Sequence, residues 1–357
     1  MASIRDVARK AGVSPTTVSR TFRTPDLLTA DTQHRVLDAA RQLGYRPRET
    51  ASDTGQQRRP ASRLSPDNSI GFLFFANLPQ QLSSPHLFYA PVLAGAQKEA
   101  AERGLHLLVH TTDMTESDAP PPLMAVERVV NGMLLVGAVE SQIVDKFAQH
   151  VPHVVLVDNR DERGIYESVI SDGFGGGLAA TRYLLERGHR RISFVSARGG
   201  VSTFQDRLRG YWCALMEAGI VPDPSLAILT DSSEEDDFPT AVGRWIERQK
   251  AGDPPTAVVA ANDSIAVHLL RTLRKEGVRV PEDVSIVGFD DLPLATASDP
   301  PLTTVHVDRE AMGRLAVQRL GVLMSQETPD EKATLPMGQY TLPVRLIVRG
   351  SCRDISR

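Results

Sequence analysis

The first 45 residues contain the feature that most constrains this chain, a pair of short helices separated by a tight turn. Ser3, with Asp6 three residues later, predicts a capping box that opens the first helix. Gly12 supplies the left-handed residue that ends it. Ser14 and Pro15 then open a second helix, since proline is favoured at the first helical position. The short connection predicts two helices that cross steeply, as in a helix-turn-helix.

The outer face of the second helix carries short hydroxyl side chains and one arginine, which are groups that reach phosphates and base edges. A third helix is expected from Thr29 to Gly44, with Val36 and Ala40 on its inner face. The alternative is a small helical hairpin with a polar surface. The residues expected to contact DNA are Ser3, Ser14, Pro15, Thr16, Thr17, Ser19, Arg20 and Thr32.

A family resemblance is carried by the segments IRDVARKAGVSPTTVSR and VLDAARQLGYRP. They resemble the LacI/GalR (lactose-repressor) family of bacterial transcription regulators. The resemblance implies a ligand-responsive, sequence-specific DNA-binding regulator, expected to repress genes of carbohydrate uptake or breakdown. It implies a homodimer on double-stranded operator DNA and a small-molecule effector, a sugar or sugar derivative. The operator, the effector and the choice between inducer and corepressor stay open, as does repressor against activator.

The charge of the chain is distributed unevenly, although its net value is only −4. Residues 1–64 hold 12 Lys/Arg against 6 Asp/Glu, whereas the rest hold 28 against 38. A basic head on an acidic body favours contact with phosphate backbones.

Other function classes leave no trace in the sequence. Cys213 and Cys352 lack pairing or metal-ligand spacing, which suits a reducing cytosol, and the N-terminus is charged where a signal peptide needs an apolar run. No apolar run approaches the roughly 18–20 residues of a membrane span. We therefore expect a cytoplasmic protein with no metal, cofactor or membrane partner. The rival hypotheses are a solute-binding protein and an α/β enzyme acting on a sugar, but no nucleophile–base set favours catalysis.

Residues 46–69 are rich in Arg, Ser, Pro and Gln and predict a linker. The domain boundaries that follow are a helix-turn-helix domain over 1–48, a linker or hinge over 49–69 and an effector-binding and dimerisation domain over 70–357. In the resembled family the hinge becomes helical on DNA and inserts a leucine into the minor groove. The matching position here is Thr54, so the usual wedge is not expected.

From Ile70 onward, apolar strands alternate with helices, which predicts parallel sheets buried on both faces. The number of strands predicts two similar lobes. The expected fold is an N-terminal all-α helix-turn-helix head joined to a two-lobed α/β periplasmic-binding-protein-like domain with parallel sheets. Helices are expected over Pro91–Arg103, Leu178–Arg187 and Arg207–Ala218. The expected strands are IGFLFF, LHLLVH, GMLLVG, HVVLVD, RISFVS, LAILT, TAVVAA and VSIVGF.

Polar residues stand directly after several of these strands, where ligands bind in open α/β sheets. Matching the family pattern residue by residue implies Asp158, Arg207, Asn262 and Asp290 as effector contacts, with Arg207 opening its helix. The alternative is that these residues cap helices, as Asp263 and Asp291 would. The segment HLFYAPVLAG resembles the family's N-P-F-F pattern and implies Phe88 and Tyr89 as an aromatic pair beside the ligand, or one of them as core.

Two further patterns predict no site. The run Gly173–Gly177 follows a strand, but lacks the third glycine and acidic partner of a dinucleotide fingerprint, so it predicts a close-packed turn. The acidic run Asp231–Asp237 predicts a solvated loop and helix start.

Overall fold

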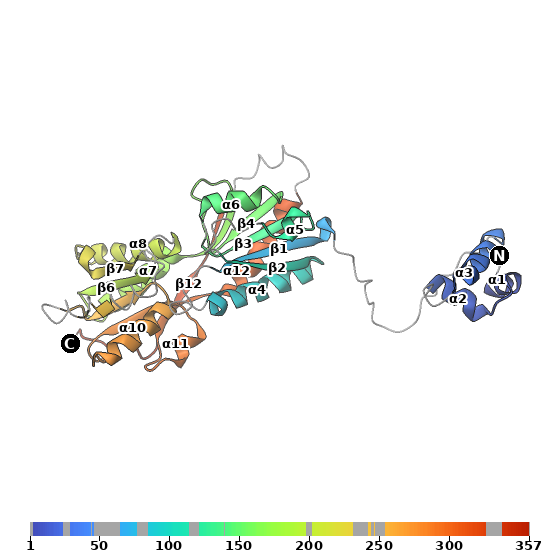
Figure 1. The fold of residues 1–357 in the computed structure, drawn as a ribbon. Coiled ribbons are helices and arrows are strands. Elements are labelled where there is room, and N and C mark those ends of the chain that lie inside the picture. The colour runs from blue at the N-terminus through green and yellow to red at the C-terminus, as the bar shows by residue number, and fades with distance from the viewer. Residues whose placement is uncertain are drawn as a thin grey trace. The chain divides into compact units, whose positions relative to one another are not determined.

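The computed structural model divides into two compact units, residues 1–62 and 63–357 (Figure 1). It describes residues 3–23, 29–43, 45, 65–76, 85–113, 121–138, 140–197, 202–230, 242–243, 246, 254–325 and 338–356. Residues 46–64 of the predicted linker, the acidic run Asp231–Asp237 and the end of the third helix at Gly44 lie outside these ranges. Residues 65–69 of the predicted linker are described: Pro66–Asn68 form a 3-10 turn, and Ser69 already begins the first strand. Among the described helices, none has the length and apolarity to cross a bilayer.

The first unit is a three-helix head made of α1 (Ile4–Ala11), α2 (Pro15–Arg23) and α3 (Ala30–Gln42). The predicted capping box is confirmed, because Ser3 and Asp6 bond each other's backbone N–H. Gly12 ends α1 with φ 65°, the left-handed conformation in which glycine pays no Cβ penalty. Thr29 precedes α3 but its side chain makes no capping bond. The core of the head consists of Val7, Ala8, Ala11, Val18, Val36, Ala39 and Ala40.

The second unit contains two lobes, each built on a six-stranded sheet. The sheet of lobe 1 has the order β11-β5-β4-β3-β1-β2, and all its neighbouring strands are parallel. Helices α5 and α6 pack on one face and α4 and α12 on the other, so both faces are covered. The strands of lobe 1 are β1 (Ser69–Ala76), β2 (His106–Asp113), β3 (Gly132–Val136), β4 (His153–Val157), β5 (Glu167–Ser171) and β11 (Gln339–Leu342). Its helices are α4 (Pro85–Glu102), α5 (Leu123–Val126), α6 (Ser141–Ala148) and α12 (Arg309–Met324).

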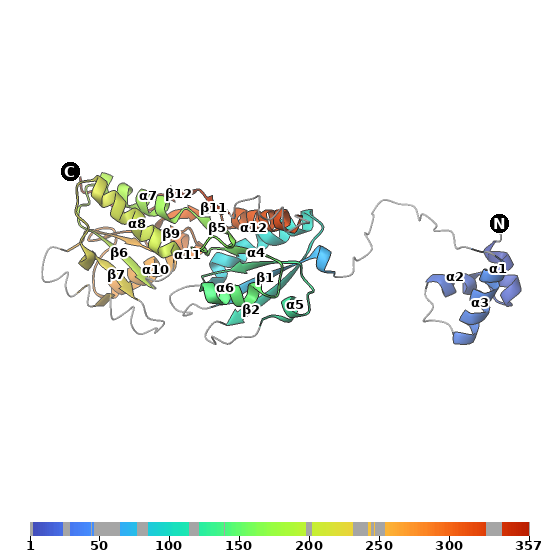
Figure 2. The same cartoon turned by 90° about the horizontal axis from the view of Figure 1, so that it is seen from above.

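The sheet of lobe 2 has the order β12-β10-β9-β8-β6-β7 and is parallel except at its β12 edge. Figures 1 and 2 show α7 and α8 on one side of this sheet and α10 and α11 on the other. The strands of lobe 2 are β6 (Ile192–Ala197), β7 (Ala227–Thr230), β8 (Ala257–Ala260), β9 (Ser285–Asp290), β10 (Thr303–Val307) and β12 (Val344–Ile347). Its helices are α7 (Gly173–Glu186), α8 (Ser202–Glu217), α10 (Asp263–Lys275) and α11 (Pro293–Ala297).

The chain crosses between the lobes at three places, after β5, after β10 and between β11 and β12. At two of these crossings, the aspartate that directly follows the strand caps the next helix, which belongs to the opposite lobe. Asp172 accepts from Gly175 N at 2.8 Å, and Asp308 accepts from Ala311 N at 2.9 Å. These caps satisfy helix N–H groups that otherwise have no partner.

The structure corrects three predicted helix boundaries. Helix α4 begins at Pro85 and contains Pro91, which was expected to begin it. Helix α8 begins at Ser202, so Arg207 is its sixth residue and does not open it. The run Gly173–Gly177 forms the first turns of α7 and not a turn before a helix. These glycines permit close packing, since a Cβ on Gly177 would collide with the backbone of Arg207 and one on Gly210 with that of Phe174.

Candidate functional site

Four of the predicted effector residues meet where the two lobes face each other. Tyr89 lies on α4 and Asp158 directly after β4, both in lobe 1. Arg207 lies on α8 and Asp290 ends β9, both in lobe 2. Parallel strands bring their carboxyl ends to one edge of a sheet, which is why residues distant in sequence converge here.

On the lobe 2 side, the guanidinium of Arg207 is almost fully buried, with 2% of the residue exposed. It forms an ion pair with Asp290 over 3.1 Å and donates to the carbonyl of Ala261. The guanidinium carbon also lies 3.8 Å from the ring centre of Phe289, a cation–π distance. Arg207 is therefore fixed in place by contacts from two strand ends.

On the lobe 1 side, the hydroxyl of Tyr89 donates to Asp158 Oδ2 at 2.7 Å. The Tyr89 ring packs against Phe74 and Phe88, each with ring centres 4.9 Å away. Phe88 is 7% exposed and belongs to the hydrophobic core of the lobe, the arrangement expected if one of the two aromatics is structural. The hydroxyl of Tyr89 thus points to the cluster, while its ring packs among the aromatic side chains of lobe 1.

Three aspartates at these strand ends adopt left-handed backbone conformations that are rare outside glycine. The φ angles are 54° for Asp158, 103° for Asp290 and 53° for Asp291. Such residues cost of order 1–3 kcal/mol each and cluster at functional sites. The backbone geometry therefore marks the same place as the side-chain cluster.

Burial shapes the electrostatics of the cluster. It raises the pKa of Asp290 to about 6, with Asp158 adding to the rise and Arg207 and Arg309 opposing it. Burial also raises the pKa of Asp158, against the hydrogen bond from Tyr89 and the charge of Arg207. The pKa of Tyr89 is raised by burial and by Asp158. The phenol is therefore a donor, and the two carboxylates share one fixed cation between them.

Several buried polar atoms of the cluster lack hydrogen-bond partners among the described residues. They are Asp158 Oδ1, Arg207 Nε and Asp290 Oδ1, the last of which has only its ion pair. Unsatisfied buried groups cost roughly 1–3 kcal/mol each. A polar ligand that donates to the carboxylates and accepts from the guanidinium would remove that cost.

The remaining predicted residue, Asn262, has a structural role in addition: its side chain caps α10 by accepting from Ile265 N at 2.9 Å. The expected caps Asp263 and Asp291 do not cap. Asp263 accepts from Thr304 Oγ1 at 2.6 Å and from Leu292 N at 2.7 Å, and burial together with Asp290 raises its pKa to about 8. Asp263 therefore stabilises the turn after β9. Sequence reasoning missed this role because its two partners lie 29 and 41 residues away in the chain.

Asp291 also stabilises the turn after β9 through its side chain. Burial opposes its charge, but hydrogen bonds from Arg349 at 2.6 Å and His306 at 2.9 Å outweigh burial and lower its pKa. Its carboxylate is therefore already occupied, whereas that of the adjacent Asp290 has only its ion pair with Arg207 and can still accept hydrogen bonds.

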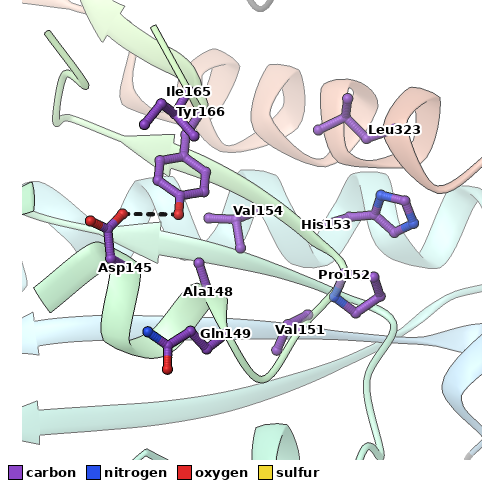
Figure 3. A pocket seen from close by; sticks show the side chains of 10 residues that line it. All are labelled: Asp145, Ala148, Gln149, Val151, Pro152, His153, Val154, Ile165, Tyr166 and Leu323. Atoms are coloured by element: carbon purple, nitrogen blue, oxygen red, sulfur yellow. Dashed lines mark hydrogen bonds between the residues drawn. The ribbon is translucent and has the colours of Figure 1, made fainter. Parts of the chain in front are cut away.

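A pocket of about 370 Å³ lies elsewhere in lobe 1, at the start of β4 and the end of α6 (Figure 3). Asp145, which points into it, already accepts from Arg163 at 2.7 and 2.9 Å and from Tyr166 at 3.0 Å. None of the six predicted effector residues lines this pocket. Because Asp145 and Tyr166 are already engaged there and no predicted effector residue lines it, we place the candidate site at the cluster.

In the head, Ser14, Pro15 and Thr16 are exposed at the start of α2. Ser14 caps α2 through Thr17 N at 3.1 Å, and its hydroxyl lies 2.9 Å from that of Thr17. Ser3 is exposed and part of the capping box, and Thr32 pairs with Thr29 at 2.9 Å. Ser19 and Arg20 lie on α2, but their side chains fall outside the described part of the chain.

Comparisons with known proteins agree with this organisation. The model for bacterial regulatory proteins of the lacI family matches residues 3–48, and that for the periplasmic binding protein-like domain matches residues 181–352. A helix-turn-helix head and a two-lobed binding domain define a ligand-responsive, DNA-binding transcriptional regulator. Within that class, the chain belongs to the LacI family.

Individual relatives support the assignment over the whole chain. The HTH-type transcriptional repressor PurR of Vibrio atlanticus is 32% identical over 324 residues, covering 90% of this chain and 91% of the relative. The HTH-type transcriptional regulator RegA of Clostridium saccharobutylicum is 31% identical over 98% of both chains. The solved structure of the transcriptional regulator CelR–cellobiose complex matches with a TM-score of 0.67 and 28% identity, over 98% of this chain and 100% of that one.

Proposed function

We propose that this regulator represses genes of carbohydrate uptake or breakdown in the cytoplasm and that an uncharged sugar binds between its lobes. The observation that carries the proposal is the set of buried, unpartnered polar atoms on Asp158, Arg207 and Asp290. Carboxylates accept from sugar hydroxyls, and a guanidinium donates to hydroxyl or ring oxygens. The similar CelR structure holds cellobiose, which supports a sugar here too.

The site favours binding over catalysis. Asp290 is held by Arg207 and Asp158 by Tyr89, and neither pair forms a nucleophile with its base. We therefore propose that the protein is not an enzyme. Asn262 is proposed to complete the effector contacts, while Phe88 supports the Tyr89 ring from the core.

For DNA, we propose that two heads of a homodimer bind a near-palindromic operator through Ser3, Ser14, Pro15, Thr16, Thr17, Ser19, Arg20 and Thr32. The proposed boundaries are 1–48 for the head, 49–69 for the linker and 70–357 for the effector domain. Thr16 and Arg20 contact base edges, while the hydroxyl groups mostly contact phosphates. Replacing Arg20 with Ala is then expected to cost about 1–3 kcal/mol of operator affinity and to relax preference at one base per half-site.

Operator selection from random duplex DNA, followed by anisotropy titration with and without sugars, tests the proposal. A palindromic site whose affinity changes at least tenfold on adding one sugar supports it. Selection of no preferred sequence would refute DNA recognition, and an affinity unmoved by sugars, sugar phosphates and nucleosides would refute effector control.

A further inference from the structure

Arg309, the first residue of α12, connects the two walls of the effector cluster. Its Nη1 donates to the carbonyl of Leu87 at 3.3 Å, and its Nη2 donates to the carbonyl of Asp291 at 3.1 Å. Leu87 lies on α4 of lobe 1, two residues before Tyr89. Asp291 lies in lobe 2, directly after Asp290. One planar guanidinium therefore holds backbone atoms next to both sides of the site.

The lobe 2 end of this contact is the strained turn after β9. Asp290 and Asp291 are consecutive non-glycine residues with positive φ, a conformation that persists only when its surroundings hold it. Within lobe 2, Asp263 binds the N–H of Leu292 and Arg349 binds the carboxylate of Asp291. Arg309 binds the carbonyl of Asp291 in this turn, and it does so from a helix that packs on α4 in lobe 1.

The charged groups around Asp290 also favour a role for Arg309 at this site. Asp290 is surrounded by Arg207 from α8, Asp158 from β4, Asp263 from α10 and Tyr89 from α4. Arg309 adds a second cation from α12 that stabilises the ionised Asp290. With it, two buried carboxylates that accept from a ligand face two guanidinium groups, and the site is close to neutral.

We propose that Arg309 is a positioning residue for the effector site, which ties the Tyr89 wall of lobe 1 to the Asp290 turn of lobe 2. The inference rests on the proposed function only in naming the cluster as the effector site. Arg309 then both joins the lobes and holds the Asp290 turn in shape, so that the ligand-accepting carboxylate is correctly placed only while Arg309 makes both contacts.

The chain offers a matched control in Arg160, which also joins the lobes. Arg160 follows β4 in lobe 1 and its Nη2 lies 2.5 Å from Asp206 Oδ2 on α8 of lobe 2. This ion pair is side chain to side chain and does not touch the turn after β9. Replacing Arg160 with Ala therefore removes a contact between the lobes without removing a hydrogen bond of the turn.

The test uses the full chain without ligand, so it does not depend on identifying the effector. Spin labels at Leu123→Cys on α5 and Met216→Cys on α8, both exposed positions in opposite lobes, report the distance between the lobes. The background carries Cys213→Ser and Cys352→Ser. Hydrogen exchange of peptides covering residues 288–296 reports the turn, since the Leu292 amide is bonded to Asp263. Melting temperatures are measured in parallel to separate local from global loosening.

For Arg309→Ala we expect a longer or broader distance distribution together with at least tenfold faster exchange over residues 288–296. For Arg160→Ala we expect a change of the distance distribution with exchange of that segment within twofold of the parent. Unchanged distance or unchanged exchange in Arg309→Ala would overturn the inference. So would equal acceleration in Arg160→Ala, because lobe opening alone would then explain the effect. If both variants behave as expected but no sugar binds the protein, the proposed effector class is refuted and the role of Arg309 stands.

Discussion

At the scale of single residues, the account rests on buried carboxylates whose oxygens are not all satisfied by hydrogen bonds among the described residues. Asp290 pairs with Arg207 within lobe 2, Asp158 faces Arg207 from lobe 1, and each carboxylate has an oxygen without a hydrogen-bond partner among the described residues. Evolution of a stable protein alone would favour apolar replacements at such positions, since buried ion pairs are costly to desolvate. Their presence at left-handed strand ends is better explained by a ligand that completes them.

Asp290→Asn tests the electrostatics of the site through the pH dependence of stability. The folded pKa of about 6 exceeds the ordinary value of 3.8, so protonated Asp290 favours folding. That contribution is full below pH 3.8 and is lost as the pH rises through 6, a change of roughly 3 kcal/mol. We expect the difference in Tm between Asp290→Asn and wild type to grow in favour of the variant from pH 4 to pH 8. A difference that stays constant over this range contradicts a raised pKa at Asp290.

At the scale of elements, two kinds of glycine have different roles. Gly12 provides a left-handed backbone, with no atom within 4 Å of a Cβ built there. Gly177 provides space, since its Cβ would meet the backbone of Arg207. The first glycine shapes the DNA-binding turn, and the second sets how closely α7 approaches the helix that carries Arg207.

Gly12→Ala is expected to destabilise the head by about 1–2 kcal/mol through the left-handed penalty alone. Gly12→Asn is the matched control, because asparagine tolerates this conformation better than alanine. Hydrogen exchange over residues 3–23 in the full chain measures both variants. Equal exchange in the alanine and asparagine variants would show that backbone conformation is not the cause.

Gly177→Ala is expected to destabilise the second unit by about 1–3 kcal/mol, because α7 and α8 must separate. Ala179→Ser, at an exposed position of the same helix, should leave urea unfolding unchanged within about 0.5 kcal/mol. Since the colliding atom belongs to the backbone of Arg207, effector binding should weaken as well. A Gly177→Ala protein that unfolds at the same urea concentration as wild type would disprove the close approach.

Apolar runs explain which elements could be predicted. The eight strands with continuous apolar sequence are confirmed as β1–β4 and β6–β9. The strands ESVIS and TTVHV are rich in hydroxyl groups, and QYTL and VRLI alternate at the lobe crossings, so none stood out. At the site, position after a strand identified Asp158 and Asp290. The roles of Asp263 and Arg309 could not be found this way, because they depend on amide and carbonyl groups that only the fold brings near.

At the scale of the whole molecule, the chain combines a basic head with a mostly acidic two-lobed body, and the sequence between them departs from the family pattern at Thr54. Regulation requires that the effector bind two states of the body with different affinity, and the coupling to DNA is then reciprocal. The contacts of Arg160 and Arg309 between the lobes are the ones that a change in lobe closure would alter.

The central claim is that the cluster of Asp158, Arg207 and Asp290 binds the effector, and a thermal-shift screen tests it most directly. Wild type, Arg207→Ala and Asp290→Asn are screened with sugars, sugar phosphates and nucleosides. At about 100 times its dissociation constant, a ligand stabilises by roughly 2.7 kcal/mol. We predict that an uncharged sugar raises the Tm of wild type and of neither variant, while both variants still bind operator DNA. An equal Tm rise in all three proteins, or no rise with any sugar, would contradict the claim.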